Sequence, residues 1–166
     1  MSIYNNLDKI WEHSHFWNWS PDWVVVKEIY EKVPESYSVL MPFAYSYFEE
    51  MIRTTTSEYG LPLFDRDGKP VKVKVGMALI KLAIEENIAN SEYVALLEKA
   101  KKHFAYTEIS NDENGRNRVM HGRVHPRFWS KEDFENLIYD IAEMSPFAQF
   151  YWMTNWYMTK SGGIYG

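Results

Sequence analysis

Apolar residues recur at helical spacing through most of the chain, and prolines, glycines and polar clusters separate the runs. The clearest run follows a capping arrangement at 130–133, where Phe134, Leu137, Ile138 and Ile141 lie three or four residues apart. Comparable runs predict helices over about 21–32, 35–59, 77–87 and 91–104. No part of the chain calls for a large sheet, so we expect an all-α fold, a single-domain helical bundle that spans 1–166.

Side chains at the ends of these runs predict where the helices begin and stop. Ser20 and Ser91 carry the small oxygen-bearing side chains that are typical of N-caps. Pro42 predicts either a kink in the second helix or a late start, because proline has no backbone N–H to donate. Gly60 is the expected C-cap of that helix. The connection over 61–74 contains an Asp-Gly-Lys-Pro turn signal, and the alternating valines after it allow a short extended piece.

Composition limits the classes of function that are open to the chain. Its 166 residues are 46% hydrophobic and 17% aromatic, which is enough apolar material for the core of one domain. The chain has no cysteine, which excludes disulfides, thiolate metal sites and cysteine nucleophiles. The first residues lack the pattern of a signal peptide and no apolar run is long enough to cross a bilayer, so we expect a cytoplasmic protein without a membrane partner.

Charge is unevenly distributed along this acidic chain, whose formal net charge is −5. The stretch 115–131 has no acidic residue and holds five basic ones, which are Arg116, Arg118, Arg123, Arg127 and Lys131. This leaves 13 of the 18 basic residues, against all 23 acidic ones, in the rest of the chain. A phosphate-bearing partner is the simplest functional interpretation, and a solvated stretch with paired arginines is the structural one.

The segment Arg-Asn-Arg-Val-Met-His-Gly within this stretch groups residue types that suit phosphodiester chemistry. Arg116 offers a permanent planar cation for a phosphate, and His121 can exchange a proton near neutral pH. Asn117 lies four residues before His121, so the two share a face if the segment is helical, as we expect from about residue 114. Together these groups could cleave a phosphodiester without a metal. By spacing alone, however, an Arg and a His five residues apart are more often coincidental.

This segment resembles the Arg–polar–x–x–x–His motif of the HEPN superfamily of small α-helical domains, many of which are ribonucleases. Arg116, Asn117, His121 and Gly122 stand at the matching places. An aromatic and acidic helical stretch at 48–53 precedes the motif, and the capped apolar run follows it, as in that superfamily. The arrangement covers about residues 20 to 145, although the specific match is only six or seven residues long.

The resemblance implies a metal-independent endoribonuclease without a cofactor, in which two copies of the motif meet across a homodimer. His121 would assist the attack of a ribose 2′-OH on the adjacent phosphate, Arg116 would steady that phosphate, and Asn117 would orient the histidine or the RNA. Such domains commonly act as toxins or in antiviral defence, which adds an antitoxin or another protein as a partner. Some have lost catalysis, so the alternative is an inactive helical module for dimerisation, protein-partner or nucleotide binding.

Four further residues are expected to bind RNA or to brace the arginines of the motif. The cations Arg118, Arg123 and Arg127 are the expected RNA-binding residues, and Glu50 is expected to brace Arg116 or Arg118. We prefer Arg116 with His121 over the looser register of Arg118 with His125, because Gly122 and Pro126 make the latter less helical.

Three other features are weaker candidates. His13 and His15 would need a third ligand, Glu12 or Asp22, to hold a metal ion. The tryptophans around them could stack bases, although packing in the core is the more common use of such residues. The aromatic tail, 147–157, is expected to be core or a surface for another subunit.

Overall fold

The described part of the chain is built from α-helices and short 3₁₀ helices. A computed structural model describes residues 2–15, 17–104 and 129–149. Its elements are α1 (Ile3–His13), α2 (Ser20–Lys32), η1 (Pro34–Ser36), α3 (Tyr37–Arg53), α4 (Met77–Glu86), α5 (Ser91–Phe104), α7 (Lys131–Met144) and η3 (Ser145–Phe147). Within these ranges there is no β-strand, only an isolated bridge between Phe64 and Pro70. The all-α prediction is confirmed for these residues.

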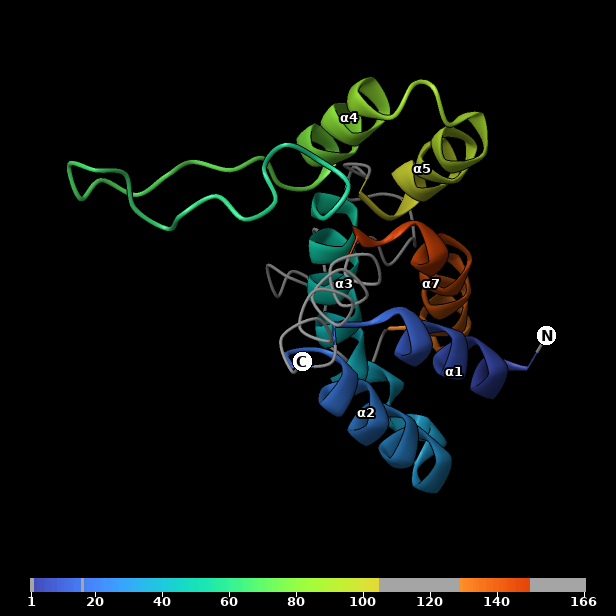
Figure 1. The fold of residues 1–166 in the computed structure, drawn as a ribbon. Helices are drawn as coiled ribbons and strands as arrows, with labels where there is room; N and C mark the ends of the chain where they lie inside the picture. The colour runs from blue at the N-terminus through green and yellow to red at the C-terminus, as the bar shows by residue number, and fades with distance from the viewer. Residues whose placement is uncertain (1, 16, 105–128, 150–166) are drawn as a thin grey trace, which may run out of the picture.

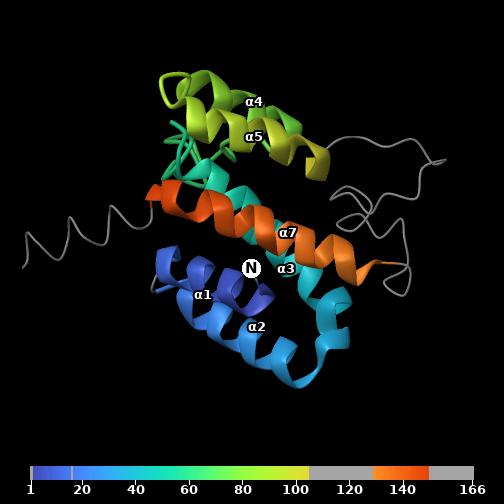
Figure 2. The same ribbon diagram turned by 90° about the vertical axis from the view of Figure 1, so that its right-hand side faces the viewer.

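The helices stack in three layers (Figure 1, Figure 2). α3 and α7 cross the middle, with α1 and α2 on one side and α4 and α5 on the other. α1 packs on both α7 and α2, while α5 packs on α4 and α7. The apolar run at 134–142 forms the buried side of α7, because Phe134, Leu137, Ile138 and Ile141 are each fully buried. α7 therefore links the two outer layers through one continuous core.

Aromatic side chains near the N-terminus form a second part of this core. The Trp23 ring lies edge-on to the rings of Phe43 and Tyr47, with centroids 5.2 and 5.0 Å apart. Trp19 meets the same two rings at 5.7 and 5.3 Å. Such edge-to-face contacts stabilise a core beyond the area that they bury. For Trp19 and Trp23, core packing thus accounts for the aromatic cluster better than base stacking.

α1 is an element that the sequence analysis did not predict. Its N-cap is Ser2, whose hydroxyl accepts a hydrogen bond from the backbone N–H of Asn5 at 3.4 Å. Leu7 and Ile10 are buried in the core, and Ile3 packs against it. These three positions lie four and three residues apart, so the helical pattern was present in the sequence and was missed.

α2 and α3 differ at their ends from the sequence-based expectation. Ser20 is the first residue of α2 and makes no capping hydrogen bond; Trp19 precedes it at the cap position. α3 begins at Tyr37, after η1, and Pro42 lies inside it, so the proline does not set the start of the helix. Gly60 is not the C-cap, because α3 has already ended at Arg53.

Three consecutive threonines explain why α3 ends there. The hydroxyls of residues 54, 55 and 56 each donate to a backbone carbonyl three residues earlier, at 2.7, 2.8 and 2.9 Å. The carbonyls of Ile52 and Arg53 also accept the backbone N–H groups of Thr55 and Thr56, so the hydroxyls add to a final turn whose bonds span three residues. Gly60 instead adopts a φ of 77° in the turn that follows.

α5 is capped by Asn90 and not by Ser91. The Oδ1 atom of Asn90 accepts a hydrogen bond from the backbone N–H of Tyr93 at 3.1 Å, whereas Ser91 is already helical. The cap predicted for α7 is confirmed, because the Ser130 hydroxyl accepts from the N–H of Asp133 at 3.2 Å.

This assignment predicts different effects for two neighbouring substitutions. Asn90→Ala is expected to lower the free energy of unfolding by about 1 kcal/mol, because one N–H at the start of α5 loses its partner. Ser91→Ala is the control and is expected to change it by less than about 0.5 kcal/mol. Urea unfolding of both variants measures the difference, and a larger loss from Ser91→Ala would contradict the assignment.

The connection between α3 and α4 contains the predicted turn. Asp65 accepts hydrogen bonds at its Oδ1 from the backbone N–H groups of Asp67 and Lys69, both at 2.9 Å. Gly68 completes the turn with a φ of 75°. The valines that follow do not form a strand.

None of the helices described here has the length and apolar character needed to cross a membrane.

Candidate functional site

The residues predicted to bind and cleave RNA lie outside the described part of the chain. They are Arg116, Asn117, Arg118, His121, Arg123 and Arg127, and the expected helix from about residue 114 lies outside it too. The structure does describe the residues on both sides of the segment 105–128, which carries them. One end is the last turn of α5 and the other is Trp129 with the Ser130 cap of α7 (Figure 2).

α5 and α7 run antiparallel. Tyr93, at the start of α5, stacks on the ring of Phe147 just beyond α7, with centroids 4.9 Å apart. His103, near the end of α5, bonds to Asp140, which precedes Phe147 on α7. α5 therefore ends beside the middle of α7, about 13 Å along the helix axis from Lys131. Beyond the segment 105–128, the described chain resumes at Trp129, which is buried.

Three cationic or protonatable side chains of α5 converge on the carboxylate of Asp140. His103 Nε2 lies 2.8 Å from Oδ2, Lys102 Nζ lies 2.7 Å from Oδ2, and Lys99 Nζ lies 2.7 Å from Oδ1. The three donors are spaced to share one face of α5. Asp140 itself is only 4% exposed. We call these four residues the Asp140 cluster.

The donors keep Asp140 ionised. Burial alone would raise its pKa, but the hydrogen bonds from His103, Lys102 and Lys99 outweigh burial and hold the pKa well below its usual range. The hydrogen bond between Lys99 and Asp140 raises the pKa of Lys99. With both lysines charged, the cluster retains an excess of positive charge.

The surroundings of His103 indicate that the Asp140 cluster anchors helices. The His103 ring is 7% exposed and lies edge-on to the rings of Tyr45 and Phe48 of α3, at 6.3 and 5.8 Å. A buried ring with aromatic neighbours has no room for a substrate. The cluster instead joins the end of α5 to α7 and α3, and thereby fixes where the segment 105–128 begins.

Sequence analysis missed this cluster although one signal was present. Asp140 lies three residues after Leu137, on the apolar stripe of an otherwise amphipathic helix. A carboxylate on such a stripe predicts a buried cationic partner. The sequence does not show which helix supplies the partner.

The cationic stretch of the sequence extends onto both flanking helices. Between residues 99 and 131 the chain has eight basic residues and three acidic ones. The side chains of Lys99, Lys101 and Lys102 are 34–51% exposed at the end of α5. Lys131 opens α7, with its Nζ 5.9 Å from the centre of the Tyr30 ring. On the α7 side, Lys131 is followed by Glu132 and Asp133, so the excess of positive charge borders the segment 105–128 on the α5 side only.

Glu50, the expected brace for Arg116 or Arg118, is paired within its own helix. Its Oε2 accepts a hydrogen bond from Nη1 of Arg53 at 2.7 Å. It follows Phe48 by two residues, so it lies about 200° around α3 from the side that meets the end of α5. The bracing role of Glu50 stays a prediction. Its neighbour Glu49 is buried and accepts from the backbone N–H of Gly76, next to α4.

The histidines near the N-terminus bond to the nearby backbone. His13 Nδ1 donates to the carbonyl of Lys9 at 2.9 Å, and His15 Nδ1 accepts from the backbone N–H of Trp17 at 3.3 Å. Over residues 2–15, 17–104 and 129–149, no three His, Asp or Glu side chains are grouped so as to hold a metal ion. The alternative of a metal site at His13 and His15 is therefore not supported.

Comparisons with known proteins give no match for this chain. No protein-family model matches it, and neither a curated protein nor a solved structure matches it. The case for a function therefore depends on the residues themselves.

Proposed function

We propose that the protein is a metal-independent endoribonuclease that acts as a homodimer through Arg116, Asn117 and His121. The observation that carries the proposal is the charge reversal around the segment 105–128. In a chain of net charge −5, the half-exposed lysines of the Asp140 cluster on α5 precede a stretch, 115–131, that is rich in arginine and has no acidic residue. The likeness of residues 116–122 to the HEPN motif supports the same activity.

The proposed reaction is an internal transfer at phosphorus. His121 accepts the proton of a ribose 2′-OH, and the 2′ oxygen forms a bond to the adjacent phosphorus. The bond from phosphorus to the 5′ oxygen breaks, and that oxygen takes up a proton, which the His121 of the second copy can supply. Arg116 stabilises the charge that develops on the phosphate oxygens, while Asn117 orients the histidine or the RNA. The products are a 2′,3′-cyclic phosphate and a 5′-OH.

The proposal is tested by incubating purified protein with single-stranded RNA in excess EDTA. Wild-type protein is expected to cut the RNA and leave cyclic phosphate ends. Arg116→Ala is expected to lower the rate by about 100-fold or more, because a cation aimed at the transition state is lost. Arg116→Lys is expected to retain part of the rate, since it keeps the charge but not the planar two-pronged donor.

Two results would contradict the proposal. Equal cleavage by the wild type and Arg116→Ala would identify a contaminating nuclease. A dimer that binds RNA or a nucleotide without cutting it would instead indicate the inactive helical module.

A further inference from the structure

The connection between α3 and α4 forms an arm that extends away from the bundle (Figure 1). We define the arm as residues 61–75. Its base is held where Arg53 Nη2 donates to the carbonyl of Lys74 at 3.1 Å and Lys74 donates its backbone N–H to Glu58 at 2.7 Å. Beyond the base, the two sides of the arm are joined by a few backbone hydrogen bonds, such as that from the N–H of Val71 to the carbonyl of Leu63 at 3.0 Å.

The arm presents large apolar side chains to solvent. Leu63 is 81% exposed and Phe64 is 58% exposed, near the tip. A lone two-stranded ribbon has little stability of its own in water, and exposed apolar side chains on it favour contact with another surface. The arm therefore has the character of a docking element.

Charge on the arm limits what it can dock against. Arg66, Lys69 and Lys72 make no ion pair among the described residues, and Lys74 pairs with Glu58. At the tip, Asp65 and Asp67 balance Arg66 and Lys69, so Lys72 leaves one positive charge in excess over the arm as a whole. The matching surface would combine an apolar hollow with carboxylates.

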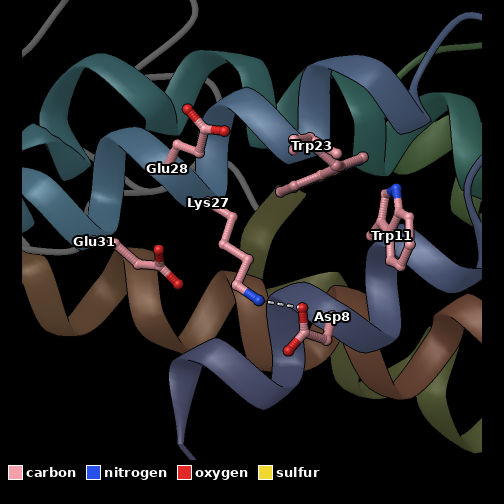
Figure 3. A pocket seen from close by; sticks show the side chains of 7 residues that line it. Asp8, Trp11, Trp23, Lys27, Glu28 and Glu31 are labelled. Atoms are coloured by element: carbon pink, nitrogen blue, oxygen red, sulfur yellow. Dashed lines mark hydrogen bonds and ion pairs between the residues drawn. The ribbon is translucent and has the colours of Figure 1, made fainter.

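A pocket between α1 and α2 has this combination (Figure 3). Its volume is about 290 Å³. Trp11 and Trp23 lie at one end of it and Glu31 lies at the other end, and Val24 also lines it. The volume is at the lower edge of small-molecule pockets, which hold about 300–1,000 Å³, and suits one or two large side chains.

The pocket also has the required charge. Lys27 points to Asp8, with its Nζ 2.5 Å from Oδ1, so these two neutralise each other. Glu28 is 3.7 Å from Lys32 in an exposed pair, which is weak. Glu31 has no ion pair among the described residues. The pocket therefore offers two carboxylates next to exposed Trp11 and Val24.

We propose that Leu63 and Phe64 of one copy of the chain dock in the α1–α2 pocket of a second copy. The apolar side chains meet Trp11 and Val24, and the arm cations face Glu28 and Glu31. A second copy is the occupant because the arm projects away from its own bundle from an anchored base (Figure 1). The arm and the α1–α2 pocket both consist of described residues, and their contact does not depend on RNA cleavage.

The absence of cysteine permits a direct test by engineered cross-linking. Leu63→Cys and Val24→Cys proteins are prepared separately, mixed in equal amounts and oxidised mildly. We expect a disulfide between the two chains that forms about tenfold faster than with Ile88→Cys in place of Val24→Cys. Ile88 is a matched control because it is 79% exposed in the turn between α4 and α5.

Second substitutions test the chemistry of the contact. Adding Phe64→Ser to the Leu63→Cys chain, or Glu31→Lys to the Val24→Cys chain, is expected to slow cross-linking by about tenfold. Glu85→Lys, on an exposed position of α4, is expected to leave the rate unchanged. Equal rates for Val24→Cys and Ile88→Cys would overturn the docking proposal. RNA cleavage by these variants is measured separately, so that failure of the docking proposal and failure of the proposed activity are distinguishable.

Discussion

Replacing Asp140 with alanine is expected to lower the free energy of unfolding by about 3 kcal/mol. The substitution removes the shared acceptor of His103, Lys99 and Lys102. The lysines are half exposed and can turn to water, but the buried His103 ring loses its partner, and a buried polar group without a partner is costly. Chemical denaturation monitored by circular dichroism measures the loss.

Two controls separate the Asp140 cluster from ordinary ion pairs. Glu98→Gln removes the exposed pair with Lys101 on the same helix and is expected to cost less than about 0.5 kcal/mol. Asp140→Asn keeps an acceptor without the charge and is expected to cost about 1–2 kcal/mol. If Asp140→Ala costs no more than Glu98→Gln, the cluster does not anchor the end of α5.

The effect of Asp140 depends on pH with a definite sign. Its pKa in the folded protein is lower than its ordinary value of 3.8. The carboxylate therefore stabilises the fold fully above that ordinary value, and the stabilisation is lost as the pH falls toward the lowered pKa. The difference in unfolding free energy between wild type and Asp140→Ala is expected to shrink as the pH falls below about 4.

Replacing His121 with alanine is expected to lower RNA cleavage by about 100-fold to 10,000-fold, because the proposed proton acceptor is removed. His125→Ala is the matched control, since it removes a histidine from the same cationic stretch and belongs to the looser register of the motif. It is expected to retain most of the rate. The measurement is single-turnover cleavage in EDTA, with circular dichroism to show that both variants keep the helical content.

The opposite ranking of the two histidine variants would assign proton transfer to a different histidine. Loss of cleavage in His125→Ala with retention in His121→Ala would move the site to Arg118 and His125. Retention in both variants would remove histidine chemistry from the proposal.

Sequence patterns predicted those helices whose signals are local. α7 has a long apolar stripe and a serine cap, and both the buried stripe and the cap are confirmed. α1 was missed although Ile3, Leu7 and Ile10 lie at helical spacing. The end of α3 was placed too late although the three threonines that bond back to its last turn are consecutive in the sequence.

The candidate site could be predicted from the sequence to a smaller extent than the helices. The motif around Arg116 was selected by its resemblance to a known motif, because residue types and spacing alone are more often coincidental, and it stays a prediction. The Asp140 cluster depends on which faces of α5 and α7 meet, and no local pattern contains that information. The same holds for the arm and the α1–α2 pocket, whose match in charge and shape appears only when the helices are packed.

Contacts between described residues dock α5 antiparallel on α7. The Asp140 cluster and the Tyr93–Phe147 stack hold the pair together from within. Closing a longer connection costs little, about 0.6 kcal/mol for a doubling in length. We therefore expect insertions and exchanged sequences between Phe104 and Trp129 to leave these contacts in place. Evolution can revise the part of this protein that we assign to recognition while leaving the supporting architecture intact.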